Sequence, residues 1–535
     1  MGGGTSSYEE LEHTDLILLW GSNARNAHPI MFHRMLVGRN NGAKLVVVDP
    51  RRSASASFAD LWLGVDVGSD IALANAMAAE IIAAGLHNEY FIGHATVGFE
   101  DYVATVEPYT PERAASITGV PAEAIIELAH LYATAERAQL CWTLGITEHH
   151  NAADNVFALI NLALLCGHVG RYGSGLAPLR GQNNVQGGGD MGALPNRLPG
   201  FCDLSDEPGR QRFEEVWGVR VPPESGWHLS EMFEAMADRR LRSLYVVGEN
   251  PADSEADVAH ARRVLADLEF LVVQDIFLTA TAQLADVVLP AAASFAETTG
   301  TVTSSERRVQ LVRAGVSPPG EARDDLAIVF ALARELGHDW GEPDAEAVWD
   351  ELRSLSRFHA GMSYRRLDAL GGIRWPCPDE EHPGSQILHE RLWADPLEGP
   401  PVPFVPVEWE APLDDLDEQY PIRLTTGRRL DSFNTGVQSG SFASPLRRRE
   451  ALDVCAADAA RLGIAEGEVV RVVSRRGAVE APVRVDPDLT EGLAFLTFHF
   501  PDQVDTNLLV PDDWDPLSGT AGFKATAVRI EPLAR

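Results

Sequence analysis

The fold is decided by two short apolar runs near the N-terminus, Leu16-Ile-Leu-Leu-Trp20 and Leu45-Val-Val-Val-Asp49. The segment between them has the length of a helix, with Pro29 near its beginning and Gly42 near its end, where these residue types favour helix boundaries. Two buried strands joined by one helix form a βαβ crossover. The stretch therefore predicts a parallel sheet.

The same pattern returns in the middle of the chain, where Leu244-Tyr-Val-Val247 and Phe270-Leu-Val-Val273 bracket a second helical segment. Both copies end their first strand in Gly-x-Asn and their second strand in Asp, at Gly21, Asn23 and Asp49 and at Gly248, Asn250 and Asp275. Open α/β sheets bind ligands beyond the carboxyl ends of their strands. We therefore expect two nucleotide-like sites. Neither copy has the Gly-x-Gly-x-x-Gly of NAD-binding units, and plain βα turns without a ligand are the alternative.

The C-terminal part indicates a third domain. Residues 395–420 are rich in proline and acidic side chains, which build neither a helix nor a central strand, and they indicate a linker. Residues 468–474 and 478–485 flank a turn and predict a β-hairpin. We expect an α/β protein with two doubly wound, dinucleotide-binding-like domains, residues 1–180 and 181–394, and a β-barrel-like domain, residues 421–535.

Composition is that of an acidic globular protein. The 535 residues carry a formal net charge of −34, which disfavours nucleic acid and anionic membranes because both require clustered Lys and Arg. No apolar run approaches the ~18 residues of a membrane span, and the N-terminus has no signal-peptide features, so we expect a cytoplasmic protein. Widely spaced cysteines argue against zinc or iron–sulfur sites and favour reduced, mostly buried thiols. They are Cys141, Cys166, Cys202, Cys377 and Cys455.

The most unusual stretch is residues 167–200, GHVGRYGSGLAPLRGQNNVQGGGDMGALPNRLPG. Its density of Gly, Asn and Gln predicts an irregular loop that wraps a polar ligand, with a flexible surface loop as the alternative. The amides of Gln182, Asn183, Asn184 and Gln186 offer donors and acceptors to a nitrogen-rich heterocycle. His149 and His150 are adjacent but lack a third spaced ligand, so we interpret them as surface or pocket-edge residues.

Several of these stretches, taken in order, resemble molybdopterin oxidoreductases of the dimethyl-sulfoxide-reductase family. The likeness rests on Asp49-Pro-Arg-Arg52, residues 167–196, Val247-Gly-Glu-Asn-Pro251 and Ala285-Asp-Val-Val-Leu-Pro290. Leu179-Arg-Gly-Gln-Asn-Asn-Val-Gln-Gly187 is similar to the catalytic subunits of formate dehydrogenases in particular. The resemblance extends from residue 5 to residue 532.

The resemblance implies two molybdopterin guanine dinucleotides, one per α/β domain, which hold a single Mo or W. It implies that Arg180 is the substrate arginine, because a planar guanidinium can bind the carboxylate of formate through two hydrogen bonds. An arginine that only stabilises the loop is the alternative. The cofactor-binding residues that it implies are Gly21, Asn23, Asp49, Arg51, Gly68, Asp70, Gly145, Gln182, Asn183, Gly248, Asn250, Gln274, Asp275, Thr426, Gly427, Arg428, Asn507 and Lys524.

The sequence departs from the family at its beginning. Formate dehydrogenases carry a four-cysteine domain for a 4Fe–4S cluster, and then a Cys or selenocysteine metal ligand and a His shortly before the segment that corresponds to Gly2-Gly-Gly-Thr5. We therefore expect the cluster and the metal ligand to lie only in an N-terminal segment missing from this sequence. A truncated reading frame, an enzyme split over two chains and a retired scaffold are the three explanations.

The function expected from the resemblance is oxidation of formate to CO2, with two electrons passing through the Mo or W centre to an iron–sulfur or flavin/NAD subunit. Residues 1–535 alone are expected to be inactive. A nitrate or other oxoanion reductase of the same family is one alternative. A cofactor-free scaffold of a redox complex is another, although the polar stretch Arg180-Gly-Gln-Asn-Asn184 argues against it.

Overall fold

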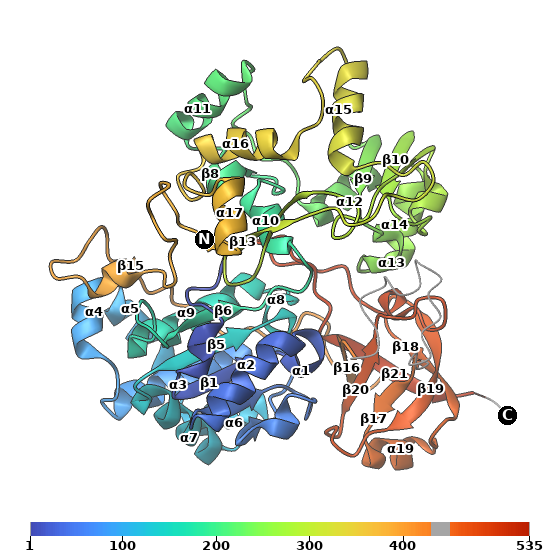
Figure 1. Ribbon diagram of the computed structural model, residues 1–535. Coiled ribbons are helices and arrows are strands. Elements are labelled where there is room, and N and C mark those ends of the chain that lie inside the picture. The colour runs from blue at the N-terminus through green and yellow to red at the C-terminus, as the bar shows by residue number, and fades with distance from the viewer. Residues whose placement is uncertain (1, 430–449, 534–535) are drawn as a thin grey trace. The chain divides into compact units, whose positions relative to one another are not determined.

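The computed structural model describes residues 2–429 and 450–533. The chain divides into two compact units, and the smaller unit interrupts the larger one in sequence (Figure 1). The larger unit comprises residues 4–179, 253–261 and 387–535, and the smaller unit comprises residues 1–3, 180–252 and 262–386.

A five-stranded parallel sheet organises the N-terminal part of the larger unit. Its strand order is β3-β2-β1-β5-β6, and every neighbouring pair is parallel. The strands are β1 (Leu16–Trp20), β2 (Lys44–Val48), β3 (Leu61–Leu63), β5 (Ala138–Trp142) and β6 (Gly175–Pro178). Helix α2 (Pro29–Asn40) connects β1 to β2, so the predicted βαβ unit is confirmed.

Helices cover both faces of this sheet. Ile17 and Leu19 of β1 pack with Phe32 and Met35 of α2, whereas Leu18 and Trp20 belong to the core on the other side. This alternation is that of a doubly wound sheet, as expected. The other helices of this domain are α1 (Ala24–Ala27), α3 (Asp70–Ala83), α4 (Glu89–Ala95), α5 (Phe99–Val106), α6 (Pro111–Thr118), α7 (Ala122–Thr134), α8 (Leu144–Thr147) and α9 (Ala152–Cys166).

The glycine-rich stretch 167–200 is more regular than expected. It contains the edge strand β6, the short helix α10 (Val185–Asp190) and β7 (Arg197–Leu198), which pairs with β8 (Cys202–Asp203). A Cβ atom added to Gly175 would lie 2.6 Å from Thr5 Oγ1, so the first residues of β6 are small because residues 5 and 6 pack on them. The prediction of a wholly irregular loop was wrong for this physical reason.

The C-terminal part of the larger unit is a closed barrel with the strand order β16-β20-β17-β19-β18-β21. Strands β18 (Val469–Val473) and β19 (Ala478–Val485) are antiparallel neighbours, which confirms the predicted hairpin. Leu424, Val472 and Leu496 are among the residues of its core. The remaining elements are β16 (Ile422–Gly427), β17 (Leu452–Val454), β20 (Leu493–Thr497), β21 (Thr526–Pro532) and α19 (Ala456–Leu462).

The proline-rich linker runs over the first α/β domain in the same unit. Its strand β15 (Val402–Pro403) pairs with β4 (Thr96–Val97), and the Phe404 ring stacks on Tyr102 with centroids 4.8 Å apart. The side chain of Asn161 donates to the Val405 carbonyl at 2.7 Å and accepts from the Val405 amide at 3.1 Å. The linker is therefore packed onto the domain rather than extended in solvent.

The smaller unit contains the second parallel sheet, of order β11-β10-β9, and an antiparallel sheet, of order β12-β13-β14. Strands β9 (Ser243–Val247) and β10 (Phe270–Asp275) pair in parallel, which confirms the predicted repeat of the pattern. The other strands are β11 (Val287–Pro290), β12 (Gly300–Thr303), β13 (Arg308–Val312) and β14 (Ile373–Arg374). The remaining helices between residues 207 and 370 are α11 (Glu207–Trp217), α12 (Leu229–Ala237), α13 (Pro251–Ser254), α14 (Val258–Ala266), α15 (Asp325–Glu335), α16 (Ala345–Leu355) and α17 (Tyr364–Leu370).

The second parallel sheet exposes apolar side chains. Val246, Leu271 and Val273 are buried in a small core with Ala282. Other side chains of β9, β10 and β11 each expose more than a third of their surface: Tyr245 37%, Val247 48%, Phe270 46% and Val287 40%. Both faces of a parallel sheet are usually covered, so these four residues form an unusual apolar surface.

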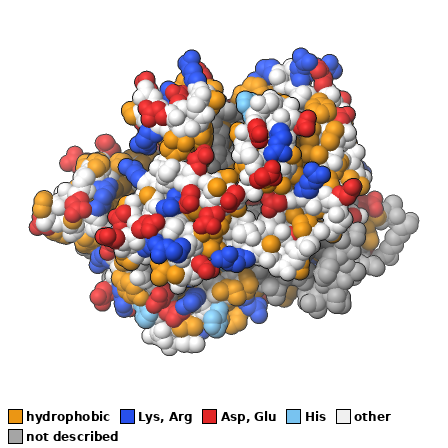
Figure 2. All heavy atoms as spheres, turned by 45° about the horizontal axis from the view of Figure 1, so that its top comes forward, with side chains coloured by type: hydrophobic (Ala, Val, Ile, Leu, Met, Phe, Trp, Pro, Cys, Tyr) orange, Lys and Arg blue, Asp and Glu red, His pale blue; other side chains and the backbone are white. Residues whose placement is uncertain are grey.

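The surface carries charges of both signs, and Figure 2 shows acidic and basic side chains interspersed over the face that it presents. Within residues 2–429 and 450–533, no helix combines the length and apolar character needed to cross a membrane. All five cysteines are free, and only Cys202 is partly exposed, which agrees with the prediction of mostly buried thiols.

Candidate cofactor and substrate sites

Two glycines join the turns that follow β1 and β5. Gly21 has a φ of +55° and donates from its amide to the Val48 carbonyl at 2.8 Å. The amide of Gly145 donates to the Gly21 carbonyl at 3.1 Å, and a Cβ atom on Gly145 would lie 2.5 Å from that oxygen. The two turns therefore meet backbone to backbone, which only glycine permits.

The two predicted asparagines make equivalent contacts in the two units. Asn23 Oδ1 accepts from the Ser55 hydroxyl at 3.2 Å and from the Ser55 amide at 3.3 Å. Asn250 Oδ1 accepts from the Thr281 hydroxyl at 2.8 Å and from the Thr281 amide at 3.1 Å. Sequence reasoning missed Ser55 and Thr281, although each lies six positions after the predicted Asp of its copy. The repeat thus extends to the loop after each second strand.

Asp49 and Arg51 follow β2 in the larger unit. Asp49 is 8% exposed, and its Oδ1 accepts from the Arg51 amide at 2.9 Å. Burial raises the pKa of Asp49, and the positive charges of Arg51 and Lys524 oppose this shift. Burial likewise lowers the pKa of Arg51. Both groups are therefore poorly solvated charges beside each other, suited to a polar ligand.

The barrel supplies the next group of predicted residues, at the end of β16. The Thr426 hydroxyl donates to the Phe523 carbonyl at 2.8 Å. A Cβ atom on Gly427 would lie 2.9 Å from the Phe495 ring and 3.8 Å from Arg51 Nη2. The structure thus brings Thr426 and Gly427 to the side chain of Arg51.

Lys524 forms a buried ion pair that the sequence did not predict. Its Nζ lies 2.6 Å from Glu148 Oε2 and 3.3 Å from the Thr426 carbonyl. Burial lowers the pKa of Arg428, and the negative charge of Glu148 opposes this shift. Glu148 directly precedes His149, and no motif in the sequence marked it as a site residue.

His149 is buried, and His150 is partly buried. His149 is 4% exposed, and burial lowers its pKa to about 4. The described residues contain no group of three or more His, Cys, Asp or Glu side chains arranged to hold a metal ion. The prediction of a surface position was wrong for His149, because the neighbouring helix α8 packs into the core of the domain through Ile146, whereas a position at the edge of a pocket stays a prediction.

Asn507 has an unsatisfied polar atom. Its Nδ2 donates to the Asp253 carbonyl at 3.1 Å, while its Oδ1 is buried and has no hydrogen-bond partner among the protein atoms described. Buried amide oxygens normally accept a hydrogen bond. A polar group bound beside Asn507 would satisfy this atom, so Asn507 fits the role of a cofactor ligand.

Gly68 and Asp70 lie at the beginning of α3. Asp70 Oδ1 accepts from Trp20 Nε1 at 2.7 Å, and burial raises the pKa of Asp70 to about 6. The Gly68 carbonyl accepts from Trp409 Nε1 at 2.9 Å, and a Cβ atom on Gly68 would lie 2.6 Å from Pro412. Gly68 therefore has to be glycine because the linker packs against it.

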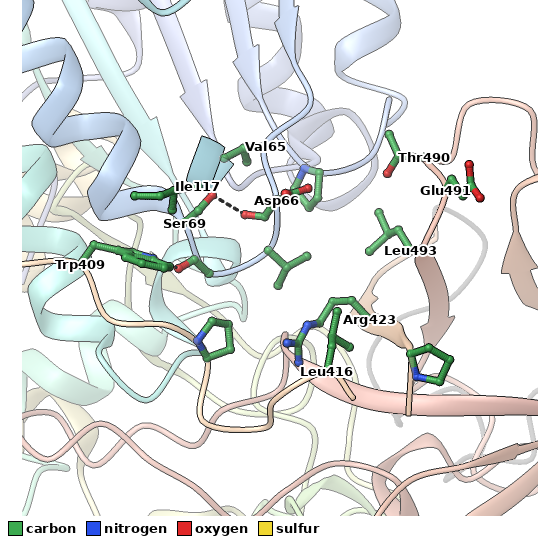
Figure 3. A pocket seen from close by; sticks show the side chains of 16 residues that line it. Val65, Asp66, Ser69, Ile117, Trp409, Leu416, Arg423, Thr490, Glu491 and Leu493 are labelled. Carbon is green, nitrogen blue, oxygen red and sulfur yellow. Dashed lines mark hydrogen bonds between the residues drawn. The ribbon is translucent and has the colours of Figure 1, made fainter. Parts of the chain in front are cut away.

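A pocket of about 300 Å³ lies between the first α/β domain, the linker and the barrel, all within the larger unit. Figure 3 shows Trp409 on one side of the pocket, Leu493 on the other, and Arg423 near Leu416. Its lining includes Pro50 and Ser69, the immediate neighbours of the predicted residues Asp49 and Asp70. The pocket thus borders the predicted nucleotide site.

The predicted residues of the smaller unit lie at the carboxyl ends of β9 and β10. The Gly248 amide donates to the Gln274 carbonyl at 2.8 Å, and Gln274 Nε2 donates to Asp325 Oδ1 at 2.5 Å. Asp275 Oδ1 accepts from the Phe277 amide at 2.9 Å, and burial raises the pKa of Asp275. The four residues Gly248, Asn250, Gln274 and Asp275 are therefore neighbours, as the topology required.

Arg180 is held by residues of its own unit. Its Nε donates to Gln186 Oε1 at 3.1 Å, its amide donates to Ser305 Oγ at 3.0 Å, and Nη2 donates to the Gly2 carbonyl. Gln182 and Asn183 are exposed, so the buried amide beside Arg180 is Gln186 rather than either of these. Gln186 was noted in the sequence as a donor and acceptor but was not among the predicted site residues.

Two family models match the chain: "Molybdopterin oxidoreductase" over residues 3–335 and "Molydopterin dinucleotide binding domain" over residues 422–527. The F420-dependent formate dehydrogenase subunit alpha of Methanocaldococcus jannaschii is 41% identical over 99% of this chain and 78% of its own length. Formate dehydrogenase H of Escherichia coli is 34% identical over 100% of this chain and 75% of its own length. The assimilatory nitrate reductase catalytic subunit of Bacillus subtilis is 32% identical, with coverages of 99% and 76%.

Among solved structures, acetylene hydratase from Pelobacter acetylenicus is similar in fold. It superposes with a TM-score of 0.77 at 21% identity, over 99% of this chain and 79% of that chain.

Proposed function

Since the chain belongs to the molybdopterin oxidoreductase family, we propose that it is the catalytic subunit of a formate dehydrogenase. The reaction is HCOO⁻ → CO2 + H⁺ + 2e⁻. The observation that carries the proposal is Arg180, a guanidinium that the buried amide of Gln186 holds in one orientation. Two relatives with formate dehydrogenase names, at 41% and 34% identity, support the choice of substrate.

Each α/β domain is proposed to bind one molybdopterin guanine dinucleotide. Asp49 with Arg51 would contact one guanine and Asp275 the other, and Arg428 and Lys524 would place positive charge near a diphosphate. Asn507 would use its unsatisfied oxygen toward a cofactor donor. The bound cofactor supplies a Mo or W centre that accepts the two electrons. The proposed domain limits are residues 1–180, 181–394 and 421–535, with residues 395–420 as the linker.

The role proposed for Arg180 follows from the shape of a guanidinium. Its fork of N–H donors can bind both oxygens of formate at once, which neutralises the carboxylate and points the C–H bond away from the protein cation. A lysine offers a point charge without this fork. An arginine at position 180 is thus expected to set the orientation of bound formate as well as its affinity.

The test is Arg180→Lys in the cofactor-loaded holoenzyme. The expected result is a raised KM for formate and a kcat/KM about 100-fold lower, or roughly 2.7 kcal/mol of transition-state stabilisation. Arg197→Lys is the matched control, because Arg197 forms a partly exposed ion pair with Asp203 in the same unit and should leave the kinetics unchanged. Kinetics of Arg180→Lys close to those of the parent would contradict the proposal.

A reductase of nitrate or another planar oxoanion is the second candidate, because the Bacillus subtilis nitrate reductase is 32% identical over nearly the whole chain. The same guanidinium fork would bind two oxygens of nitrate. Assays of the holoenzyme with formate and an oxidised dye, and with nitrate and a reduced dye, distinguish the two. The sequence of residues 179–187 and the higher identity of the formate dehydrogenases favour formate.

An electron-accepting subunit with an iron–sulfur, flavin or nicotinamide centre is the proposed partner, because the two electrons must leave the catalytic chain. Metal analysis of the purified holoenzyme decides between Mo and W. Co-purification of the chain with its neighbours from native cells identifies the acceptor subunit.

A further inference from the structure

A line of three buried side chains lies behind Arg180 in the smaller unit. Arg180 Nε donates to Gln186 Oε1 at 3.1 Å, and Gln186 Nε2 donates to Asp190 Oδ1 at 2.6 Å. On the far side, Trp375 Nε1 donates to Asp190 Oδ2 at 2.7 Å. Gln186 is 3% exposed and Asp190 and Trp375 are fully buried, so solvent does not compete for these hydrogen bonds.

The short helix α10 creates this line. Gln186 and Asp190 are four positions apart, so both side chains lie on the same face of the helix. Trp375 reaches the carboxylate from the segment after β14. The hydrogen bond from Trp375 therefore joins distant parts of the chain, whereas the hydrogen bonds that link Asp190 to Arg180 through Gln186 lie within one short segment.

The polarity of each hydrogen bond in the line is determined. An ionised carboxylate only accepts, so Gln186 must present its NH2 group to Asp190 and its carbonyl oxygen to Arg180. Reversing the amide would place an NH2 group against the N–H of Arg180, two donors in contact. The charge on Asp190 thus selects one orientation of Gln186, and Gln186 selects one orientation of the guanidinium.

The charged groups around Asp190 come from two further segments. Arg180 and Arg307 both lower its pKa through their positive charges, and the hydrogen bonds from Gln186 and Trp375 act in the same direction. Burial is the largest effect, and it raises the pKa to about 6. Arg307 is fully buried and donates to the carbonyls of Ser385 and Gln386 at 3.0 and 2.8 Å.

We propose that Asp190 is a positioning residue which, acting through Gln186, orients Arg180 for the carboxylate of formate, so that formate affinity follows the ionisation of Asp190. The inference rests on the proposed function, in which Arg180 binds formate. When Asp190 gains a proton, one of its oxygens becomes a donor and no longer requires the NH2 group of Gln186. The amide can then rotate, and the guanidinium loses its fixed orientation.

The expected pH dependence has one sign. As the pH falls from 7.5 to 5.5, the KM for formate should rise by about 3- to 4-fold, because the ionised fraction of a single group that titrates near pH 6 falls from about 0.97 to about 0.24 over this range. Formate itself stays ionised in this range, since simple carboxylic acids titrate near about 4. The value of kcat should change less than KM, because Asp190 acts on binding geometry.

The first experiment uses the parent holoenzyme and needs no variant. The KM for formate is measured from pH 5.5 to 8.0, and formate binding is measured by calorimetry over the same range. A KM and a binding constant that are both flat from pH 5.5 to 7.5 would overturn the inference. An inflection near pH 6 in both measurements supports it.

Variants then assign the inflection to Asp190. Asp190→Asn should raise the KM about 10-fold at pH 7.5 and remove the inflection, because an asparagine can accept from only one of its two donors. Trp375→Phe should move the inflection to higher pH, because the ionised carboxylate loses a donor. Asp203→Asn is the matched control, since Asp203 is a partly exposed carboxylate of the same unit and should leave the profile unchanged.

The outcomes separate this inference from the proposed function. If Arg180→Lys loses formate affinity while Asp190→Asn keeps both the parent affinity and the parent inflection, the inference fails and the proposed function stands. If Arg180→Lys binds formate as the parent does, Arg180 is not the substrate residue and both fail. If Asp190→Asn does not fold, the profiles of the parent and of Trp375→Phe still decide the question.

Discussion

The guanidinium carbon of Arg51 lies 3.4 Å from the centroid of the Phe495 ring. Arg51 follows a strand of the first α/β domain, and Phe495 belongs to barrel strand β20. A guanidinium over an aromatic face is attracted by the negative ring face, and the attraction grows when both partners are desolvated. The contact therefore stabilises the packing of the barrel on the first α/β domain beside the predicted cofactor residue Arg51.

Replacing Phe495 by leucine should weaken this attachment. We expect the variant to lose about 0.5 to 2 kcal/mol beyond the cost of the smaller side chain, and to retain less molybdopterin on purification. Phe500→Leu is the matched control, because Phe500 is equally buried in the same domain. Thermal unfolding and cofactor content are the measurements, and equal losses in the two variants would contradict the prediction.

A methyl group on Gly145 should disrupt the contact between the two turns. Gly145→Ala would bring a Cβ atom to 2.5 Å from the Gly21 carbonyl oxygen, so the turns must separate. We expect a loss of stability of about 1 to 3 kcal/mol, as for overpacked sites, and poor cofactor retention. Gly93→Ala is the control, because a Cβ atom there meets nothing within 4 Å. Parent-like melting of Gly145→Ala would argue against a rigid junction.

Asp70 should make stability depend on pH in a defined direction. Its folded pKa of about 6 lies above the unfolded value of about 3.9. The neutral form is therefore favoured by folding, and its stabilising contribution is lost as the pH rises through about 6. Asp70→Asn should thus melt higher than the parent at pH 7.5, and the difference should shrink at pH 5.0.

The matched control for Asp70 is Asp60→Asn. Hydrogen bonds from Arg39 lower the pKa of Asp60, so its contribution has the opposite sign and is lost as the pH falls. Melting curves of the cofactor-free protein at both pH values provide the comparison. The same pH trend in both variants would show that burial of Asp70 is not the cause.

The exposed face of the second parallel sheet should promote self-association of the protein comprising residues 1–535. Tyr245, Val247, Phe270 and Val287 together form an apolar surface of the kind that mediates association. Sedimentation velocity over a series of micromolar concentrations should show a rising weight-average mass. Val247→Lys should reduce this effect, whereas Val469→Lys, at an exposed position of the barrel, should not. A constant monomer mass for the parent would exclude the prediction.

Local patterns in the sequence predicted the parts of the fold that depend on neighbours along the chain. The apolar runs before Gly21 and Asp49 predicted buried strands, and the structure confirms that these strands are parallel neighbours. The turn at residues 475–477 predicted the hairpin that the structure also contains. The sequence also predicted that the turn with Asn23 and the turn with Asn250 each lie at the carboxyl edge of a parallel sheet, because the carboxyl ends of parallel strands share one edge.

The tertiary partners of the candidate site could not be predicted in the same way. Glu148 and Lys524 lie 376 positions apart in the sequence, and nothing in the hydrophobic periodicity around either residue specifies the other. Gln186 was placed in an irregular loop, whereas α10 turns it inward toward Arg180. Ser55 and Thr281 are detectable only when the two copies are aligned beyond their aspartates.

The stacking of Phe404 on Tyr102 has a consequence for protein synthesis. A ribosome adds about 5 to 20 residues per second, so on the order of tens of seconds separate the emergence of the two rings. During that interval the nascent first domain displays the aromatic surface that the linker later covers. The growing chain, more than the finished protein, would therefore need a chaperone at this place. Slower translation between the two codons would lengthen that need.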